Sequence, residues 1–278
     1  MVDAVRVPGS SANLGPGFDG VGMALSLYAD VGVVDGDLPD RARVADRHHP
    51  ADVAFRRLGG TGEIWVCSQI PMGRGLGFSG AVRVGGALLA TLQRDGVDRP
   101  EREQLDDVFR VAAELEGHGD NVAASLYGGV IGTNGHRAAR VTLGVDLDVV
   151  VWVPSYTTST SESRGSLPQS VSLDDVAFNI SHTALLLAAL NSGDLRALSE
   201  ATADRVHQDV RLAAVAPSRA ALDAGLAAGA VCGWLSGSGP TVAFFAEAGG
   251  GDDLARQLPA DGTAKVLEID MLGARRLV

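Results

Sequence analysis

The chain is built around one glycine-rich stretch, Pro71-Met72-Gly73-Arg74-Gly75-Leu76-Gly77-Phe78-Ser79-Gly80-Ala81. A β-like run at residues 64–67 ends just before it, and apolar residues at three-and-four spacing predict a helix directly after it. Glycines let the backbone approach a ligand closely, and a helix N-terminus presents unpaired N–H groups at the positive end of its dipole. The stretch therefore predicts an anion site, with a phosphate chain as the simplest ligand. A tight packing turn uses the same residues and is the competing interpretation.

The composition limits the class of protein. A length of 278 residues suits one large domain or two small ones, and 46% hydrophobic residues can form a core. The net charge of −11 argues against nucleic acid and anionic membranes as partners. We find no run of about 18 apolar residues and no signal peptide, so we expect a cytoplasmic protein. Cys67 and Cys232 lie in apolar, strand-like runs and are expected to be buried, reduced thiols.

The chain has a single lysine, Lys265, near its C-terminus. A phosphate loop of the Walker type carries a lysine inside the loop, and the stretch at residues 71–81 has none. If this stretch binds phosphate, backbone amides, arginine side chains and a metal ion must provide the binding.

Three further loops carry small and polar residues. Residues 8–20 form a long loop whose strongest polar groups are Asn13 and Asp19, which are either turn residues or functional. Residues 116–121, Glu-Gly-His-Gly-Asp-Asn, place two carboxylates, a histidine and an amide close together, and helix capping explains only one of them. Residues 236–241 form a second glycine loop.

The second half of the chain mixes strands and helices. The apolar run at residues 149–153 predicts a strand buried on both faces, and residues 155–163 predict a loop. Ser172 and Asp175 resemble a capping box that starts a long helix. Asn179 and His182 mark the polar face of that helix. Its buried face is predicted to contain Val176, Ala177, Ile180, Ala184, Leu187 and Leu190.

Taken together, these loops resemble the motifs of the GHMP kinase superfamily, and within it they are most similar to those of the homoserine kinases. The matching segments are residues 11–19, 71–81, 116–123, 160–168, 207–211 and 236–241, so the resemblance covers nearly the whole chain. It implies an α+β fold of two domains. Residues 1–145 would form a domain like the second domain of ribosomal protein S5, and residues 146–278 a ferredoxin-like domain.

The resemblance also implies an activity. The family transfers the γ-phosphoryl group of ATP, with Mg²⁺, to the hydroxyl of a small alcohol, here L-homoserine in threonine biosynthesis, and homodimers are common in it. Ser79 and Glu116 match its metal ligands. The positions that match its phosphate-binding and closing loops are Arg74, Gly75, Leu76, Gly77, Ser79, Gly80, Gly237 and Gly239.

The remaining matches concern the acceptor. Asp120 would orient the attacking hydroxyl or accept its proton, and Asn121 would act as an orienter. The positions that match substrate contacts are Asn13, Asp19, His118, His182 and Arg211. Asp19 suits an ammonium group, and Arg211 matches an arginine that binds the substrate carboxylate.

The chain departs from the family pattern at two places. Phe78, Ser79 and Gly80 stand where two serines and an alanine are usual, and His182 is expected at the position of a second carboxylate-binding arginine. A histidine cannot reproduce a bidentate guanidinium contact. Besides homoserine kinase, two alternatives therefore stay open. One is a GHMP kinase for another alcohol such as mevalonate, and the other is a catalytically silent protein that binds a nucleotide or metabolite.

Overall fold

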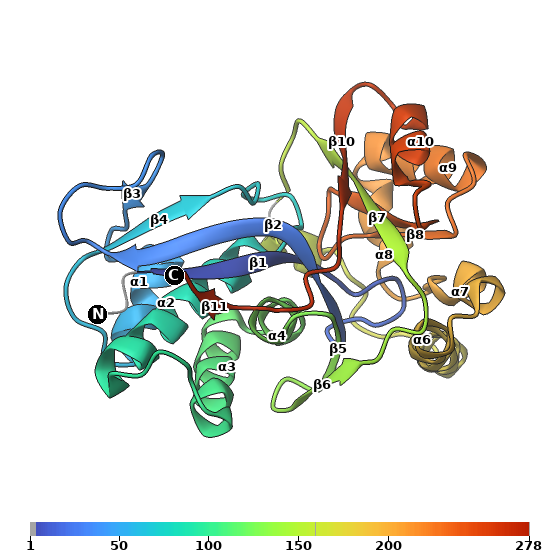
Figure 1. Ribbon diagram of the computed structural model, residues 1–278. Coiled ribbons are helices and arrows are strands. Elements are labelled where there is room, and N and C mark those ends of the chain that lie inside the picture. The colour runs from blue at the N-terminus through green and yellow to red at the C-terminus, as the bar shows by residue number, and fades with distance from the viewer. Residues whose placement is uncertain (1–3, 159, 278) are drawn as a thin grey trace.

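The computed structural model describes residues 4–158 and 160–277, which form two sheets, each covered by helices (Figure 1). The first is a seven-stranded sheet in which β11-β1-β2-β4-β3 form one path and β5 and β6 extend it from β2. Its strands are β1 (Ala4–Ala12), β2 (Val21–Val33), β3 (Arg43–Val44), β4 (Ile64–Ser68), β5 (Val130–Thr133), β6 (Ala138–Val141) and β11 (Arg275–Arg276).

Strand β1 runs further than the sequence predicts. The loop expected from residue 8 begins only after Ala12, because the strand continues past a register shift between Pro8 and Gly9 in its pairing with β2. Proline and glycine are tolerated in strands at such irregularities. The longer strand carries Ser10 and Ala12 to the edge of the glycine-rich stretch, where the amide of Ser10 donates to the carbonyl oxygen of Leu76 over 3.1 Å.

Four helices lie on one side of the first sheet (Figure 1). The helices α2 (Phe78–Asp95) and α4 (Asp120–Tyr127) pack on its strands, and α1 (Pro50–Arg57) and α3 (Arg102–Glu116) pack mainly against α2. The helix predicted after the glycine-rich stretch is confirmed as α2, and its apolar residues are buried. At Gly86 the helix backbone passes so close to α1 that a Cβ atom would lie 2.0 Å from the carbonyl oxygen of Ala51. This close packing fixes the N-terminus of α2 relative to the sheet.

The second sheet is antiparallel, with the strand order β10-β7-β9-β8. Its strands are β7 (Leu147–Pro154), β8 (Cys232–Leu235), β9 (Val242–Glu247) and β10 (Gly262–Leu267). The chain order is strand, helices, two strands, helix and strand, which is the ferredoxin-like pattern. Val149 and Val151 pack into one core cluster and Val150 and Trp152 into another, so the predicted burial of β7 on both faces is confirmed.

The helices of the second half are α5 (Thr160–Gly165), α6 (Leu173–Ser192), α7 (Leu195–Ala201), α8 (Gln208–Ala213), α9 (Ala216–Ala227) and α10 (Gly251–Gln257). The short helix α5 occupies part of the segment for which the sequence predicts a loop. After β10 the chain returns to the first sheet, where Ile269 bridges to Leu25 and Arg276 pairs with Val5. The division at residues 145 and 146 stays a prediction, and the end of the chain belongs to the first sheet (Figure 1).

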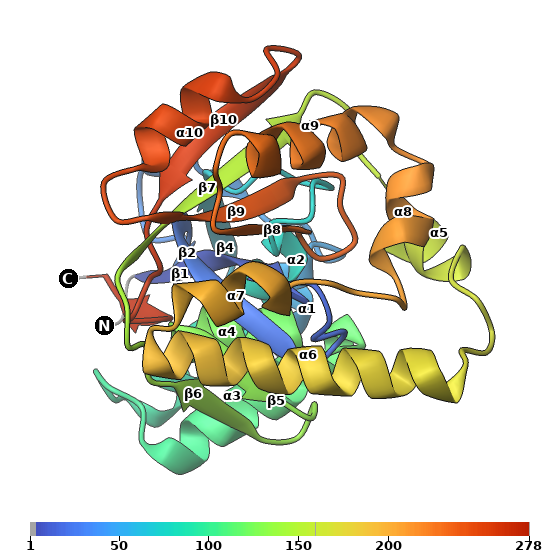
Figure 2. The same cartoon turned by 90° about the vertical axis from the view of Figure 1, so that its right-hand side faces the viewer.

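Helix α6 lies across the surface of the molecule (Figure 2). Ser172 caps it as predicted, accepting a hydrogen bond from the amide of Asp175. The predicted buried face is confirmed only in part: Leu190 is buried and Leu187 packs on the core, whereas Ile180 is 66% exposed and Ala177 and Ala184 are exposed as well. The other buried side chains are Asn179, Leu186 and Ala189. Apolar residues lie on several sides of this helix, so their spacing does not identify the side that meets the core.

Candidate active site

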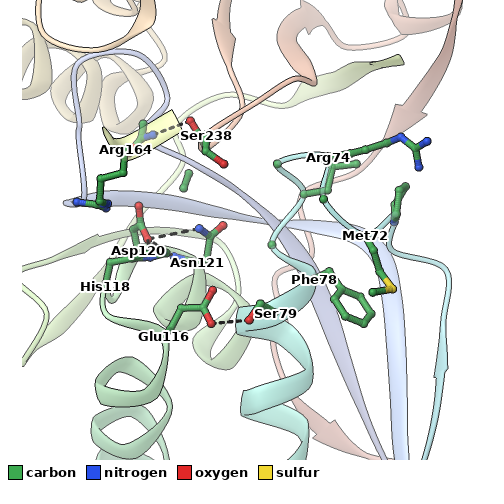
Figure 3. Close-up of a pocket in the computed structure, with 18 of the residues that line it drawn as sticks. Met72, Arg74, Phe78, Ser79, Glu116, His118, Asp120, Asn121, Arg164 and Ser238 are labelled. Atoms are coloured by element: carbon green, nitrogen blue, oxygen red, sulfur yellow. Dashed lines mark hydrogen bonds and ion pairs between the residues drawn. The ribbon is translucent and has the colours of Figure 1, made fainter. Parts of the chain in front are cut away.

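A cavity of about 170 Å³ opens where loops of both halves meet (Figure 3). Its walls come from the end of β1 and the loop after it, the glycine-rich stretch, the loop between α3 and α4, helices α5 and α8, and the loop between β8 and β9. Its lining contains the following predicted site residues: Asn13, Asp19, Arg74, Gly75, Leu76, Gly77, Ser79, Glu116, His118, Asp120, Asn121, Arg211 and Gly237. The predicted residues Gly80, Gly239 and His182 do not line it.

Two glycines shape the wall nearest to α2. Gly75 has a φ of +72°, and a Cβ atom on it would lie 2.3 Å from the carbonyl oxygen of Ser236. Gly77 has a φ of +70°, and a Cβ atom on it would lie 2.1 Å from the hydroxyl of Ser10. Gly77 is also the N-cap of α2 and brings no side chain to the helix end. The first amides of an 18-residue helix thus face the cavity, an arrangement suited to an anion.

Glu116 lies beside that helix end. The hydroxyl of Ser79 donates to Oε2 of Glu116 over 2.7 Å, and Nε of Arg83 donates to the same oxygen over 2.7 Å (Figure 3). Arg83 does not line the cavity, and nothing in its sequence context identifies it as a site residue.

The oxygen atoms of Ser79 and Glu116 are hard ligands of the kind that Mg²⁺ prefers. Within residues 4–158 and 160–277, no group of three or more His, Cys, Asp or Glu side chains could hold a metal ion. The pair therefore fits a Mg²⁺ ion that takes its other ligands from phosphate and water, and it does not form a complete protein site.

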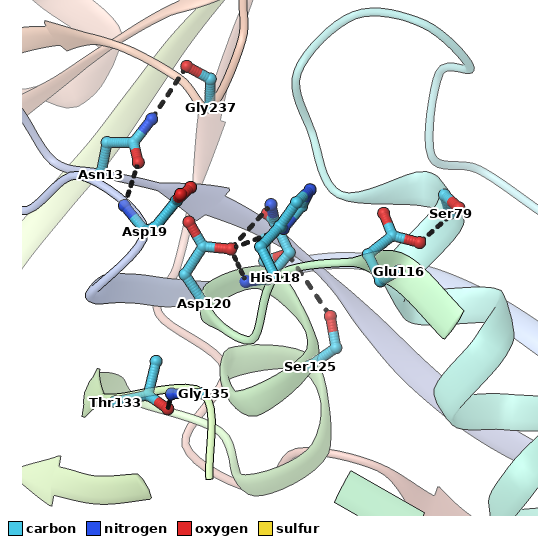
Figure 4. Close-up of polar contacts among 12 residues, drawn as sticks. Asn13, Asp19, Ser79, Glu116, His118, Asp120, Ser125, Thr133, Gly135 and Gly237 are labelled. Carbon is cyan, nitrogen blue, oxygen red and sulfur yellow. Dashed lines mark hydrogen bonds and ion pairs between the residues drawn. The ribbon is translucent and has the colours of Figure 1, made fainter. Parts of the chain in front are cut away.

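Asp120, His118 and Asn121 form a hydrogen-bonded cluster at the start of α4 (Figure 4). Oδ1 of the buried Asp120 accepts from Nδ1 of His118 over 3.0 Å and from the backbone N–H of Asn121 over 2.7 Å. The hydrogen bond with Asp120 raises the pKa of His118 above its usual value. Oδ1 of Asn121 accepts from the hydroxyl of Ser10 over 2.9 Å, which fixes the orientation of the side-chain amide.

Asn13 is placed differently from expectation. Its Nδ2 donates to the carbonyl oxygen of Gly237 over 3.0 Å, and its Oδ1 accepts from the amide of Asp19 over 3.1 Å (Figure 4). Both ends of this amide are therefore used to join the loop after β1 to the loop between β8 and β9. Asn13 shapes the cavity wall through these contacts.

Asp19 meets an arginine that the sequence did not identify. Its two carboxylate oxygens accept from the two terminal nitrogens of Arg164 over 2.7 and 3.0 Å. Arg164 comes from α5 and lines the cavity, although 145 positions separate it from Asp19. It lies in the segment at residues 160–168, which resembles the corresponding segment of the family. That resemblance was the one sequence signal that could have identified Arg164 as a site residue.

Arg211 reaches the same part of the cavity from α8. It is buried, and one terminal nitrogen donates to the carbonyl oxygen of Gly237 over 3.3 Å and to Nδ1 of His207 over 3.1 Å. Because arginine only donates, Nδ1 of His207 accepts, and its Nε2 donates to the carbonyl oxygen of Gly15 over 2.8 Å. The buried Nε of Arg211 has no partner among the described residues. The guanidinium as a whole lines the cavity, where its charge favours an anion.

His182 lies elsewhere. Its ring stacks on Phe178 of the same helix, with centroids 3.7 Å apart, and its Nδ1 is 2.9 Å from the carbonyl oxygen of Phe178. Arg164, not His182, is the second cationic side chain near Arg211. The prediction that His182 contacts the substrate finds no support in this geometry.

Arg74 and Phe78 also differ from a simple phosphate-binding role. The guanidinium of Arg74 points away from Asp120 and donates to the carbonyl oxygens of Pro154 and Ser155 (Figure 3). It therefore ties the glycine-rich stretch to the end of β7. The ring of Phe78 lies near Met72, on the side of the cavity away from Asp120, and meets His49 edge-on (Figure 3). In this position it does not block the space between Ser79 and Asp120.

Comparison with known proteins identifies the family of this chain. The family model described as the N-terminal domain of GHMP kinases matches residues 51–129, and the model of the GHMP kinase C-terminal region matches residues 186–264. The homoserine kinase of Streptomyces avermitilis is 38% identical over 97% of this chain and 94% of that protein. The homoserine kinase of Moorella thermoacetica is 36% identical over 87% of this chain and 86% of that protein.

Solved structures show the same fold. The chain is similar to the homoserine kinase of Cytophaga hutchinsonii with a TM-score of 0.83 at 22% identity, covering 99% of this chain and 97% of that one. The mevalonate kinase of Methanococcus jannaschii gives a TM-score of 0.68 at 12% identity, covering 97% and 98%. The two-domain fold expected from the sequence is thereby confirmed, and the chain belongs to the GHMP kinases, in the family of the homoserine kinases.

Proposed function

We propose that the protein transfers the γ-phosphoryl group of ATP to the hydroxyl of L-homoserine. The observation that carries the proposal is the division of one cavity into two ends. One end presents backbone amides and the N-terminus of α2, and the other presents Arg211, Arg164 and Asp19. The first end suits a chain of phosphates and the second suits a zwitterionic amino acid.

The phosphate end works by positioning and by neutralising charge, which are the main demands of phosphoryl transfer. The amides of residues 75–80 would hold the phosphate oxygens. Ser79 and Glu116 would hold Mg²⁺, which neutralises charge on the transferred group when it is bound. No lysine is available here, so the helix N-terminus provides the fixed positive potential.

Asp120 lies between the two ends and is the group that would hold the acceptor hydroxyl. All hydrogen bonds that it accepts from the described residues go to Oδ1, so Oδ2 is the oxygen for the hydroxyl proton. The His118 and Asn121 contacts hold the carboxylate in place. We propose that Asp120 orients the hydroxyl and takes its proton as the phosphoryl group is transferred.

The acceptor end would recognise both charges of homoserine. Arg211 and Arg164 both line the cavity and would offer guanidinium nitrogens to the substrate carboxylate. Asp19 would take the ammonium group. Arg164 and Asp19 pair with each other in this structure. The substrate would insert between them, with its carboxylate on Arg164 and its ammonium group on Asp19.

Purified protein with MgATP should release ADP in the presence of L-homoserine and form its O-phosphate, detected by ³¹P NMR. A panel containing mevalonate tests the alternative acceptor. The reasons for favouring another alcohol were His182 and Phe78. His182 lies outside the cavity lining and the ring of Phe78 lies away from Asp120 (Figure 3), so we expect mevalonate to be inert. Turnover of mevalonate with homoserine inert would refute the proposal, and absence of any turnover would favour the silent binding protein.

We further propose that the protein is a homodimer that packs through α6. Part of the face predicted as buried points outward, with Ile180 66% exposed, and Leu173 at the start of the helix is 81% exposed. No charged residue follows Asp175 in this helix. Since each chain has a net charge of −11, two copies can approach through an uncharged, self-complementary helix face with little repulsion.

Light scattering after gel filtration tests the dimer. Ile180→Glu should convert it to a monomer, whereas Ser181→Glu, next to it on the helix, should not. A monomeric wild-type protein would contradict the proposal. By length and composition α6 could also cross a membrane, which is weak support because core helices pass the same test. Sedimentation of the wild type with liposomes would point to that alternative instead.

The same proposal places the protein in threonine biosynthesis in the cytoplasm. Its support is the acceptor-binding end of the cavity and two free cysteines. Cys232 is buried as expected, whereas Cys67 is only partly buried. A strain that lacks its homoserine kinase and requires threonine should grow when it expresses this chain without any export signal.

A further inference from the structure

Arg83 makes an ion pair at the place where the metal ion would bind. It lies on α2, four positions after Ser79 and thus on the same side of the helix. Its Nε is 2.7 Å from Oε2 of Glu116, and the two side chains are only 18% and 12% exposed. A largely buried carboxylate needs compensation, and Arg83 provides the opposite charge.

The position of Glu116 makes this compensation necessary. Glu116 is the last residue of α3, and Gly117 ends that helix with a φ of +88°. A carboxylate at a helix C-terminus faces the negative end of the dipole, which is unfavourable. Ser79 and Arg83 both donate to Oε2, while no described residue hydrogen-bonds to Oε1. The carboxylate is therefore held by one oxygen and presents the other.

We propose that Arg83 is a positioning residue that holds Glu116 by Oε2 and cancels its charge, so that the protein takes its divalent cation together with the nucleotide rather than before it. The one carboxylate and the one guanidinium sum to zero charge, which gives a free cation little attraction. A nucleotide brings the negative charge that the protein lacks here. Arg83 thereby couples metal binding to nucleotide binding, with Ser79 and Glu116 as the protein residues that would hold the metal.

The test is the coupling between Mn²⁺ and ADP, measured by EPR titration of Mn²⁺ with the full-length protein in the presence and absence of ADP. Arg83→Met and Arg83→Gln remove the charge, and Arg83→Lys keeps it. Arg57→Met is the matched control, because Arg57 pairs with Glu114 on the same helix α3 at an exposed site. Circular dichroism establishes that each variant is folded, and Arg83→Gln serves if Arg83→Met is not.

We expect the wild-type protein, Arg83→Lys and Arg57→Met to bind Mn²⁺ much more tightly with ADP than without it. In Arg83→Met and Arg83→Gln, Mn²⁺ binding without ADP should tighten, and the coupling factor should fall about tenfold. An unchanged coupling factor in these two variants would overturn the inference. This inference rests on the proposed function for the role of the nucleotide only. If the EPR result holds and homoserine is not phosphorylated, the choice of acceptor fails and the role of Arg83 stands.

Discussion

The two ends of the cavity are built in different ways. The phosphate end comes from consecutive backbone groups between β4 and α2, shaped by Gly75 and Gly77, with Ser79 only two positions further on. The acceptor end is assembled from side chains on separate elements, Asp19 after β1, Arg164 on α5 and Arg211 on α8. The difference indicates that the reaction type is specified locally, while the choice of acceptor depends on how distant segments pack.

The largest effect should come from Asp120, where the two ends meet. Asp120→Asn keeps the size of the side chain and removes the carboxylate that would take the proton. We expect kcat for homoserine to fall by about 10²–10⁴ with a nearly unchanged KM for ATP, measured by coupled ADP release. Retention of more than about a tenth of kcat would mean that Asp120 only holds His118 and Asn121 in place.

The next largest effect separates the two ends. Arg211→Met should raise KM for homoserine by about 10², because a buried charge-assisted contact to the carboxylate is lost, and leave KM for ATP unchanged. Arg205→Met is the control: Arg205 lies over the ring of Phe178 outside the cavity lining and should change either KM less than about twofold. An equal rise in KM for homoserine and for ATP in Arg211→Met would contradict the assignment of Arg211 to the acceptor end.

The wall behind Arg211 should make stability depend on pH. Burial lowers the pKa of His207 below its ordinary value of 6.5, so the folded protein keeps this ring neutral. As pH falls through 6.5, the unfolded chain takes up a proton that the folded chain does not, and stability decreases by at most about 1.4 kcal/mol for each pH unit from this group. Urea unfolding at pH 7.5 and 5.5 should show this loss, and His207→Gln should make it smaller. An equal loss in the variant would assign it to other groups.

The smallest effect should come from Phe78, at the phosphate end. Its ring lines the cavity near Met72 and away from Asp120 (Figure 3). Phe78→Ser should raise KM for ATP by about two- to fivefold through lost apolar contact and leave KM for homoserine unchanged. A gain in kcat of more than about tenfold would show instead that the ring crowds the phosphates.

The same contrast explains which parts of the site the sequence predicts. The glycine-rich stretch, Glu116 and Asp120 lie in short segments that match family motifs, and these matches predict their roles. The structure places them together in the cavity lining. Arg164 could not be assigned in this way, because its partner Asp19 lies 145 positions away and only the packing of α5 joins them. From the sequence alone, Arg83 is expected to be a surface residue of α2. Only the structure shows that it contacts Glu116.

His182 shows what such a motif match leaves open. Its predicted role rested on the resemblance of its position to that of a family arginine, and apolar residues on several sides of α6 leave the rotation of this helix undetermined by the sequence. In the structure its ring stacks on Phe178. The fold class was predictable because hydrophobic periodicity and loop motifs agree over nearly the whole chain. The rotation of one surface helix depends on tertiary contacts, which the spacing of apolar residues does not specify.

The most direct test of the account compares L-homoserine with 3-aminopropan-1-ol, which keeps the ammonium and hydroxyl groups and lacks the carboxylate. If Arg211 and Arg164 recognise the carboxylate, kcat/KM should favour homoserine by about 10³ or more, because a site built for a charged group rejects an analogue without it. The ratio should fall toward one in the Arg164→Met/Arg211→Met double variant. Comparable kcat/KM values for the two alcohols in the wild-type protein would contradict the assignment of the acceptor end.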